Sequence, residues 1–293
     1  MAFQGAIFDV DGVLVDSPHE LAWRESFREL METEWREVRD QTSWTPERFT
    51  PAVYQQVMAG KPRMAGARAA LEHFGVPDVE ARAEQYAAAK QEQIVRLIEE
   101  GRFMAFPDAL RFILVVKGMG IRVAAASSSK NAKLFLSQIR LDTFAAEQRL
   151  EYGFIHDGMT LAELFDADIS GRDFERGKPD PMIFLTAAQE LGLDPGDCFV
   201  VEDASSGVQA AKAGGMAALG VARLGDEQLL ADGPDLCTRH NGNWRSDHLL
   251  PWELAHTAVW RMLVWPGDPR IGRVWCWCCW PTASASSTWP RYS

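Results

Sequence analysis

The chain has 293 residues, a formal net charge of −11 and a hydrophobic fraction of 47%. This length allows one large domain or two modest ones, and the hydrophobic fraction is ordinary for a globular protein. The negative charge argues against a general nucleic-acid binder, whose surface would be basic. No apolar stretch reaches the ~20 residues that span a bilayer, and the first residues lack the pattern of a signal peptide. We therefore expect a cytoplasmic protein with no nucleic-acid partner and no membrane partner.

The first predicted element is a short buried strand in the sequence QGAIFDV, at residues 4–10. Asp9 and Asp11 stand two positions apart where this apolar run ends, and Gly12 supplies a turn. Two carboxylates at the end of a buried strand are unusual enough to suggest chemistry, although aspartate is also common in turns.

The apolar period then changes to that of a helix. Trp23, Phe27, Leu30 and Met31 have the spacing of one helix face, with charged residues between them. Only helical patterns follow, as in the alanine-rich sequence ARAEQYAAAKQEQIVRLIEE. Residues 18–99 are therefore predicted to form an inserted all-helical domain.

Strands and helices alternate after Gly101. Helices are predicted in PDALRFILVVKGMG, PMIFLTAAQELGL and SGVQAAKAGG, and strands in IRVAAASSS, DCFVVED and MAALGV. Apolar strands that alternate with helices imply a parallel sheet with right-handed crossovers. We predict an α/β protein with a Rossmann-like parallel-sheet core, formed by residues 1–17 and 100–236, around the helical insertion.

Residues 237–293 differ from the rest of the chain. They hold eight of the eleven tryptophans and four of the five cysteines, and no period runs through them. The paired cysteine spacing of a zinc site is absent, and Cys198 alone cannot start a disulfide framework. We predict an atypical, poorly ordered or aberrant tail, with a frame-shifted reading of the gene as one explanation and a functional module as the alternative.

Candidate catalytic residues follow the predicted strands. In a parallel sheet, ligands bind beyond the carboxyl ends of the strands. Asp9 and Asp11 end one strand, the serines from Ser127 end another, and Glu202 with Asp203 end a third, while Lys178 precedes a helix. Each close pair of carboxylates costs roughly 4 kcal/mol at an effective dielectric of 20, so this arrangement calls for a cation. Carboxylate oxygens suit Mg²⁺, and a serine-rich turn and a lysine suit a phosphate. The sequence thus predicts a magnesium-assisted phosphoryl-transfer site.

Four ordered motifs carry a resemblance to a known family. DVDGVLVDS, ASSSKN, GKPDP and VVEDASSGVQAAKAGG resemble the haloacid dehalogenase-like superfamily over residues 4 to about 235. The resemblance implies that Asp9 is the nucleophile, that Asp11 is the general acid and base, and that Ser127 and Lys178 hold the phosphoryl group. It also implies a set of magnesium ligands: Asp9, the main-chain carbonyl of Asp11, Glu202 and Asp203. Because the dehalogenases of the superfamily use one motif aspartate and no metal, the second aspartate favours phosphoryl transfer.

Within the superfamily, the helical insertion resembles the cap of beta-phosphoglucomutases. The implied substrate-binding residues are His19 of HELAW, Gly60 and Arg63 of AGKPR, Lys90, and Ser129, Lys130 and Asn131 of the serine-rich loop. An arginine fork at position 63 suits a second phosphate, since it can bind two oxygens at once. About twenty additional residues, roughly 145–163, could reshape the entrance to the site.

Each candidate also has a structural interpretation. Ser127 to Ser129 could be merely a helix cap, and Glu202 could be structural. Lys178, Arg63 and Lys90 could be solvent-exposed. His19 could pack within the first helix of the insertion, and Trp23 is expected in the core. The leading functional hypothesis is a mutase, acting as a monomer, that converts the small molecule beta-glucose 1-phosphate to glucose 6-phosphate. A sugar-phosphate phosphatase of the same family is the alternative. A non-catalytic binding protein is a third hypothesis, which the intact set of motif residues disfavours.

Overall fold

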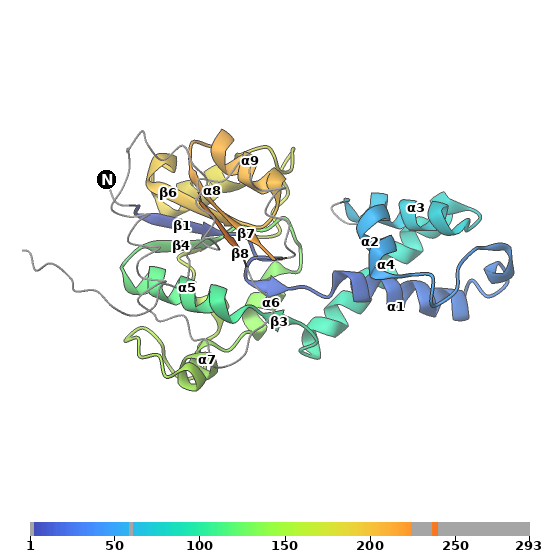
Figure 1. Ribbon diagram of the computed structural model, residues 1–293, viewed down its shortest axis with the longest axis horizontal. Coiled ribbons are helices and arrows are strands. Elements are labelled where there is room, and N and C mark those ends of the chain that lie inside the picture. The colour runs from blue at the N-terminus through green and yellow to red at the C-terminus, as the bar shows by residue number, and fades with distance from the viewer. Residues whose placement is uncertain (1–2, 59–60, 224–235, 240–293) are drawn as a thin grey trace, which may run out of the picture. The chain divides into compact units, whose positions relative to one another are not determined.

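The computed structural model describes residues 3–58, 61–223 and 236–239, and they form two compact units (Figure 1). Unit 1 contains the described residues as far as Leu14, then Pro107–Lys130, and those from Leu164 onward. Unit 2 contains Val15–Phe106 and Asn131–Glu163. The predicted insertion, residues 18–99, falls within unit 2, and this unit also includes Asn131–Glu163, which the sequence analysis places in the core. The domain boundaries of the sequence analysis stay a prediction.

The described part of unit 1 is a parallel sheet with flanking helices. Its strands are β1 (Gly5–Phe8), β4 (Arg122–Ala125), β5 (Ala167–Asp168), β6 (Cys198–Glu202), β7 (Ala217–Ala222) and β8 (Leu236–Arg239). Its helices are α5 (Pro107–Gly118), α8 (Met182–Leu191), α9 (Ser205–Ala213) and the 3-10 helix η3 (Pro195–Asp197). The strand order is β5-β4-β1-β6-β7-β8, and every neighbouring pair is parallel. This confirms the predicted α/β class with a Rossmann-like parallel sheet.

Strand β1 lies in the middle of the sheet and is buried on both faces. Ile7 belongs to the hydrophobic cluster that α8 and α9 cover, whereas the ring of Phe8 lies 6.0 Å from that of Phe112 on α5. Successive side chains of a strand point to opposite faces, so helices on both faces require a continuous apolar run rather than an alternating one. Strand β1 lies between β4 and β6 in the sheet (Figure 1), so Asp9, which directly follows β1, lies between the ends of these two strands.

Two strands of this sheet were not predicted from the sequence, because little in the chain marks them. Strand β5 has two residues, too few for a period to show. Strand β8 pairs with β7 from Leu219–Leu236 to Ala222–Arg239, so it includes the first three residues of the predicted tail. Residues 240–293, the rest of that tail, lie outside the described residues.

Unit 2 is mainly helical. Its elements are β2 (Val15–Asp16), α1 (His19–Glu32), η1 (Arg39–Gln41), α2 (Pro51–Val57), α3 (Arg63–Phe74), α4 (Val79–Glu99), β3 (Met104–Ala105), α6 (Ala132–Gln138) and α7 (Leu141–Gln148), and η2 (Leu161–Leu164) lies across its last boundary. Strands β2 and β3 pair antiparallel where the chain enters and leaves the first helical segment. The additional residues 145–163 form the end of α7 and a loop that the antiparallel bridge between Arg140 and Thr160 closes.

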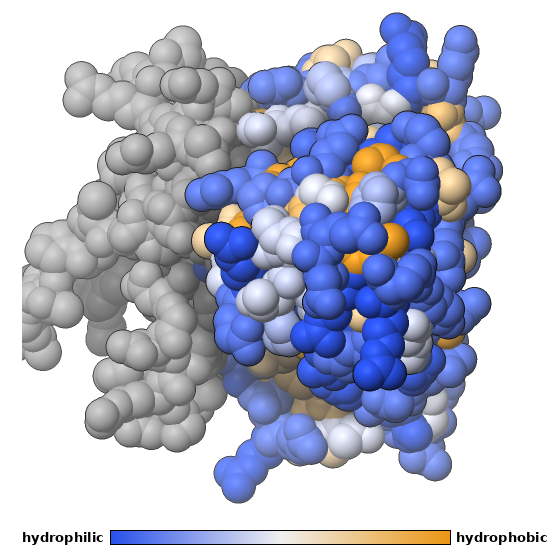
Figure 2. Space-filling model, turned by 90° about the vertical axis from the view of Figure 1, so that its right-hand side faces the viewer, coloured by the Kyte–Doolittle hydropathy of each residue, from blue (hydrophilic) through white to orange (hydrophobic). Residues whose placement is uncertain are grey.

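The helices of unit 2 bury their own aromatic core. The predicted face of α1 is confirmed, since Trp23, Phe27, Leu30 and Met31 are all buried. Phe27 lies at the centre, and its ring contacts those of Trp35, Trp44, Phe49, Phe74 and Tyr86. The face of unit 2 that Figure 2 shows is largely hydrophilic, with a few small hydrophobic areas. No helix among the described residues has the length and apolar character that a bilayer crossing requires.

Candidate active site

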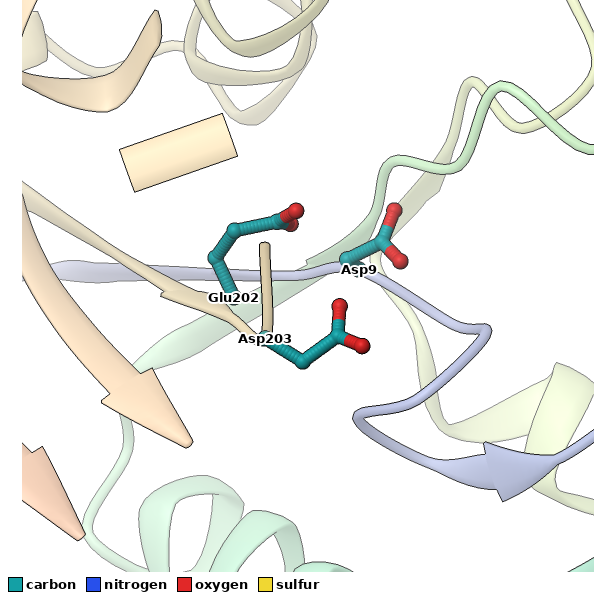
Figure 3. Close-up of side chains that lie close together, drawn as sticks. All are labelled: Asp9, Glu202 and Asp203. Atoms are coloured by element: carbon teal, nitrogen blue, oxygen red, sulfur yellow. The ribbon is translucent and has the colours of Figure 1, made fainter. Parts of the chain in front are cut away.

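The site in unit 1 forms where β1, β4 and β6 end. The backbone N–H of Asp9 donates to the carbonyl of Val201, which continues the pairing of β1 with β6 by one residue. Parallel pairing in register therefore brings Asp9 beside Glu202 and Asp203, as the carboxyl-end rule for parallel sheets predicts. Figure 3 shows the three acidic side chains lying close together.

Lys178 connects two of these carboxylates. Its Nζ atom donates to Oδ1 of Asp9 at 2.7 Å and to Oε2 of Glu202 at 3.1 Å. The Lys178 side chain is 12% exposed, and it lies over the ring of Phe184 on α8 at 4.9 Å. The structural interpretation of Lys178 as a solvated surface residue is therefore wrong.

Two glycines make room for the carboxylates. A Cβ atom on Gly12, whose φ is +77°, would lie 1.9 Å from Oδ2 of Asp203. A Cβ on Gly207, in the first turn of α9, would lie 2.1 Å from the Glu202 carboxyl. No side chain fits at either position, so the two glycines let the acidic side chains approach the turn and the helix closely.

The carboxyl cluster has the composition of a metal site. Asp9, Glu202 and Asp203 each offer an oxygen, and these atoms lie within 4.8 Å of one another. Asp9 and Glu202 are buried, so their charges have little water to stabilise them. A donor set made only of carboxylate oxygens fits a hard divalent cation such as Mg²⁺.

The crowding of negative charge alters the acidity of the site. Burial raises the pKa of Asp9 although Lys178 opposes the shift, and burial raises the pKa of Glu202 well above its usual value. Burial, followed by the charge of Asp9, raises the pKa of Asp203 to about 7. Burial alone would lower the pKa of Lys178, but Asp9 and Glu202 outweigh it, so the pKa of the lysine lies above its usual value. Additional positive charge at this place would favour the ionised carboxylates.

Ser127 belongs to the turn after β4 and contacts Asp11. Its hydroxyl donates to Oδ2 of Asp11 at 3.4 Å and accepts from the backbone N–H of Ser129 at 3.1 Å. Its own backbone N–H donates to the hydroxyl of Ser170, which follows β5. The backbone carbonyl of Ser127 accepts from Gly171, so residues after β5 support the serine loop. Sequence analysis missed Ser170, because β5 is too short to reveal that a strand ends there.

Lys130, a predicted substrate-binding residue, is held within unit 1. Its Nζ donates to the carbonyl of Gly171 at 2.7 Å and to Oδ1 of Asp173 at 2.5 Å. The next predicted residue, Asn131, begins the second segment of unit 2 and is buried.

His19, Lys90 and Trp23 lie together in unit 2. Lys90 Nζ lies 3.2 Å from Nδ1 of His19 and 5.4 Å from the ring centre of Trp23. Lys90 is 6% exposed, so its interpretation as a solvent-facing lysine is wrong. Trp23 is part of the core, as expected, and its ring also packs against Tyr86.

Arg63 and Asn131 are linked through a glutamine that sequence analysis missed. Arg63 Nη1 donates to Oε1 of Gln91 at 2.6 Å, and Gln91 Nε2 donates to Oδ1 of Asn131 at 2.8 Å. Gln91 directly follows Lys90 on α4, and no motif in the sequence distinguishes it from the other glutamines of that helix. Gly60, the remaining predicted residue, lies outside the described residues.

Comparisons with known proteins agree on the family. The model of haloacid dehalogenase-like hydrolases matches residues 3–215. The beta-phosphoglucomutase of Mycobacterium bovis is 33% identical over 238 residues, which are 76% of this chain and 82% of that protein. Protein CbbY of Rhodobacter capsulatus is 27% identical over 218 residues, with coverages of 74% and 84%. The crystal structure of an archaeal beta-phosphoglucomutase from Pyrococcus sp. strain ST 04 matches with a TM-score of 0.56 at 25% identity and covers 87% of this chain and 98% of its own.

The chain belongs to the haloacid dehalogenase-like family, and it is therefore an enzyme of the phosphoryl-transfer type that the carboxyl cluster accommodates. Within that family it is a member of the beta-phosphoglucomutase-like subfamily, and protein CbbY is also similar to it.

Proposed function

We propose that the chain is a magnesium-dependent phosphotransferase in which Asp9 carries the phosphoryl group, and that its substrate is a hexose phosphate. The observation that carries the proposal is the position of Lys178, whose ammonium bridges Asp9 and Glu202 inside a buried carboxyl cluster. A lysine and a divalent cation together offset part of the charge of three carboxylates and of an incoming phosphate dianion.

The proposed chemistry has two steps. First, a carboxylate oxygen of Asp9 attacks phosphorus, the bond from phosphorus to the ester oxygen breaks, and Asp11 gives that oxygen its proton. Second, Asp11 takes a proton from an incoming hydroxyl group, whose oxygen attacks phosphorus and displaces the Asp9 carboxylate. Ser127 and Lys178 hold the phosphoryl oxygens by donating hydrogen bonds.

We assign the magnesium ligands to the side chains of Asp9, Glu202 and Asp203 and to the main-chain carbonyl of Asp11. The bound ion would keep the carboxylates ionised and offset charge on the phosphoryl oxygens.

The substrate proposal is a mutase that converts beta-glucose 1-phosphate to glucose 6-phosphate. The similarity to the Mycobacterium bovis beta-phosphoglucomutase supports it over most of both chains. Arg63 adds support, since its guanidinium donates to Gln91, which in turn donates to the predicted substrate-binding residue Asn131. We assign Arg63 to the second phosphate of a sugar bisphosphate, and His19, Gly60, Lys90, Ser129, Lys130 and Asn131 to the sugar.

A phosphatase is the second candidate. The similarity to protein CbbY covers about the same share of the chain at 27% identity. The crystal structure of a CbbY variant from Rhodobacter sphaeroides contains xylulose-(1,5)bisphosphate, and it matches this chain at 23% identity with a TM-score of 0.53, a likeness of fold. In a phosphatase, water replaces the sugar hydroxyl in the second step.

One assay separates the two candidates. Beta-glucose 1-phosphate is supplied with magnesium and a trace of the 1,6-bisphosphate, and glucose 6-phosphate is detected by coupled oxidation while released phosphate is measured in parallel. A mutase forms glucose 6-phosphate with little free phosphate. Release of phosphate alone replaces the mutase by the phosphatase, and absence of both products excludes this substrate. Full activity in excess chelator would contradict the magnesium site.

A further inference from the structure

Arg223 directly follows β7 and reaches the turn that begins with Asp11. Its Nε donates to the carbonyl of Gly12 at 3.2 Å, and its Nη2 donates to the carbonyl of Val13 at 2.9 Å. Its Nη1 donates to Oδ2 of Asp108 at 2.7 Å, at the beginning of α5. The side chain is 9% exposed, so these bonds are largely shielded from water.

The turn that Arg223 holds runs from Val10 to Leu14. The N–H of Leu14 donates to the carbonyl of Val10, which closes a single turn around Asp11, Gly12 and Val13. Gly12 has a positive φ and no side chain with which to pack, and a Cβ there would collide with Asp203. Arg223 contacts this turn from outside it, and two of its hydrogen bonds go to carbonyls of the turn.

We propose that Arg223 is a positioning residue for Asp11: by fixing the Gly12 and Val13 carbonyls, it keeps the Asp11 carboxyl where it can give a proton to the leaving oxygen. The inference rests on the proposed function, because it assumes that Asp11 is the general acid. The carbonyl of Gly12 belongs to the peptide that joins Gly12 to Val13, so a change in its orientation is transmitted through the backbone of Gly12 to Asp11.

A guanidinium is suited to this role and an ammonium is not. Arginine presents five N–H donors in a rigid plane, so it can reach two carbonyls and a carboxylate at once. Lysine is a point charge on a flexible stem and can satisfy at most part of that set in a defined orientation. Asp108 accepts from the Nη1 atom of Arg223 and so helps to fix the plane of the guanidinium.

Arg223 also connects the segment where the chain leaves unit 1 with the segment where it returns to that unit. The chain passes from unit 1 to unit 2 after Leu14 and returns before Pro107. Val13 and Asp108 each lie next to one of these points, and both bond to the same guanidinium. The contact thus ties the turn after Asp11 to the beginning of α5.

The test uses the dependence of rate on the leaving group. An aryl phosphate such as nitrophenyl phosphate has a stable leaving anion and needs little protonation, whereas an alkyl phosphate such as glycerol 2-phosphate needs a proton donor. We measure kcat/KM for phosphate release with magnesium in the full chain, because this ratio reports the steps up to departure of the leaving group. The variants are Arg223→Gln, Arg223→Lys and Asp11→Asn, with Arg122→Gln as the matched control. Arg122 also donates to a backbone carbonyl, that of Leu191, but it begins β4 at the opposite end of the sheet.

We expect Arg223→Gln to lower kcat/KM for the alkyl ester by about 10²-fold and for the aryl ester by less than about fivefold, because a general acid contributes roughly 10² to 10⁴. Arg223→Lys should recover part of the loss. Asp11→Asn should show the same selectivity more strongly, and Arg122→Gln should show none.

The outcomes separate the inference from the function on which it rests. If Asp11→Asn is selective for the alkyl ester but both Arg223 variants are not, the positioning role is wrong while the proposed function stands. If Asp11→Asn lowers both rates equally, Asp11 is not the general acid, and the inference fails together with that part of the proposed function. Thermal unfolding of each variant identifies a folding defect, and if Arg223→Gln does not fold, the selectivity of Arg223→Lys decides.

Discussion

Lys178 Nζ and Asp9 Oδ1 lie 2.7 Å apart in an ion pair whose side chains are 12% and 8% exposed. The two residues are 169 positions apart in the chain, and only the parallel sheet and the loop before α8 bring them together. The same ammonium reaches Glu202, so one positive charge pairs with two buried carboxylates.

Replacement of Lys178 tests how much the site depends on this ammonium. Lys178→Met should lower kcat toward an aryl phosphate by about 10²-fold or more, since removal of a donor to developing charge costs roughly that much. It should also destabilise the metal-free fold, because breaking a buried ion pair costs about 3–5 kcal/mol. The control is Lys117→Met, which removes a more exposed ion pair of the same length, with Asp166. Nearly wild-type turnover in Lys178→Met would show that the lysine serves only the fold.

The stability of the metal-free protein should depend on pH with an unusual sign. Burial and Asp9 raise the pKa of Asp203 to about 7, whereas the usual value is 3.8. Because the folded state then binds more protons than the unfolded state between these values, the stabilising contribution is complete below pH 3.8 and is lost as the pH rises toward 7. Thermal unfolding in chelator should show the melting temperature falling from pH 5 to 7.5. Added magnesium should reverse this trend, because the ion favours ionised carboxylates. The same slope with and without magnesium would contradict the assignment of Asp203 as a ligand.

Arg63 should distinguish substrates with two phosphates from those with one. Arg63→Ala should lower mutase turnover on beta-glucose 1-phosphate by on the order of 10²-fold, if the charge-assisted contact is worth about 3 kcal/mol. Hydrolysis of a small aryl phosphate should hardly change, since it has no second phosphate. Arg68→Ala is the matched control, because Arg68 lies on the same helix and pairs with Glu80 instead. If wild type forms glucose 6-phosphate and Arg63→Ala does so equally well, the mutase assignment survives and the role of Arg63 is wrong.

Two truncations should separate the last strand from the residues after it. A chain that ends after Arg239 keeps β8 and all of the candidate site residues, so it should retain activity and melting temperature. A chain that ends after Asp235 loses β8 and leaves the edge of β7 unpaired on that side, so its melting temperature should be lower. Circular dichroism melts and the aryl phosphatase assay measure both effects. A folded but inactive chain ending after Arg239 would show that later residues take part in function.

The sequence was most informative where a single rule applies to long elements. The apolar run that ends at Asp9 and the helical spacing from Trp23 to Met31 each predicted an element that the structure contains. The carboxyl-end rule then predicted that Asp9, Lys178 and Glu202 lie at the same edge of the sheet, and the hydrogen bonds of Lys178 to both carboxylates agree with this prediction. Such inferences succeed because the period and the strand direction determine where a side chain lies.

The supporting residues could not be predicted in the same way. Ser170 follows a strand of two residues, and Gln91 contacts Arg63 and Asn131 only because separate segments of unit 2 meet there. Arg223 was the easiest of these residues to predict, since it follows the predicted strand MAALGV at the same edge of the sheet as the other site residues. Its partners, however, are backbone carbonyls, and no residue pattern reveals which carbonyls a turn exposes.

The central claim is that Asp9 carries the phosphoryl group, and direct trapping of that intermediate tests it. The Asp11→Asn variant is mixed with magnesium and nitrophenyl phosphate, whose departure needs little protonation, and the reaction is quenched in acid. Without its general base the variant should be slow to release the phosphoryl group, so the intermediate should accumulate. Mass spectrometry of the proteolysed chain should find one added phosphoryl group on the peptide that contains Asp9, and none after the further substitution Asp9→Asn. A phosphoryl group on any other residue, or its persistence in the Asp9→Asn chain, would contradict the account.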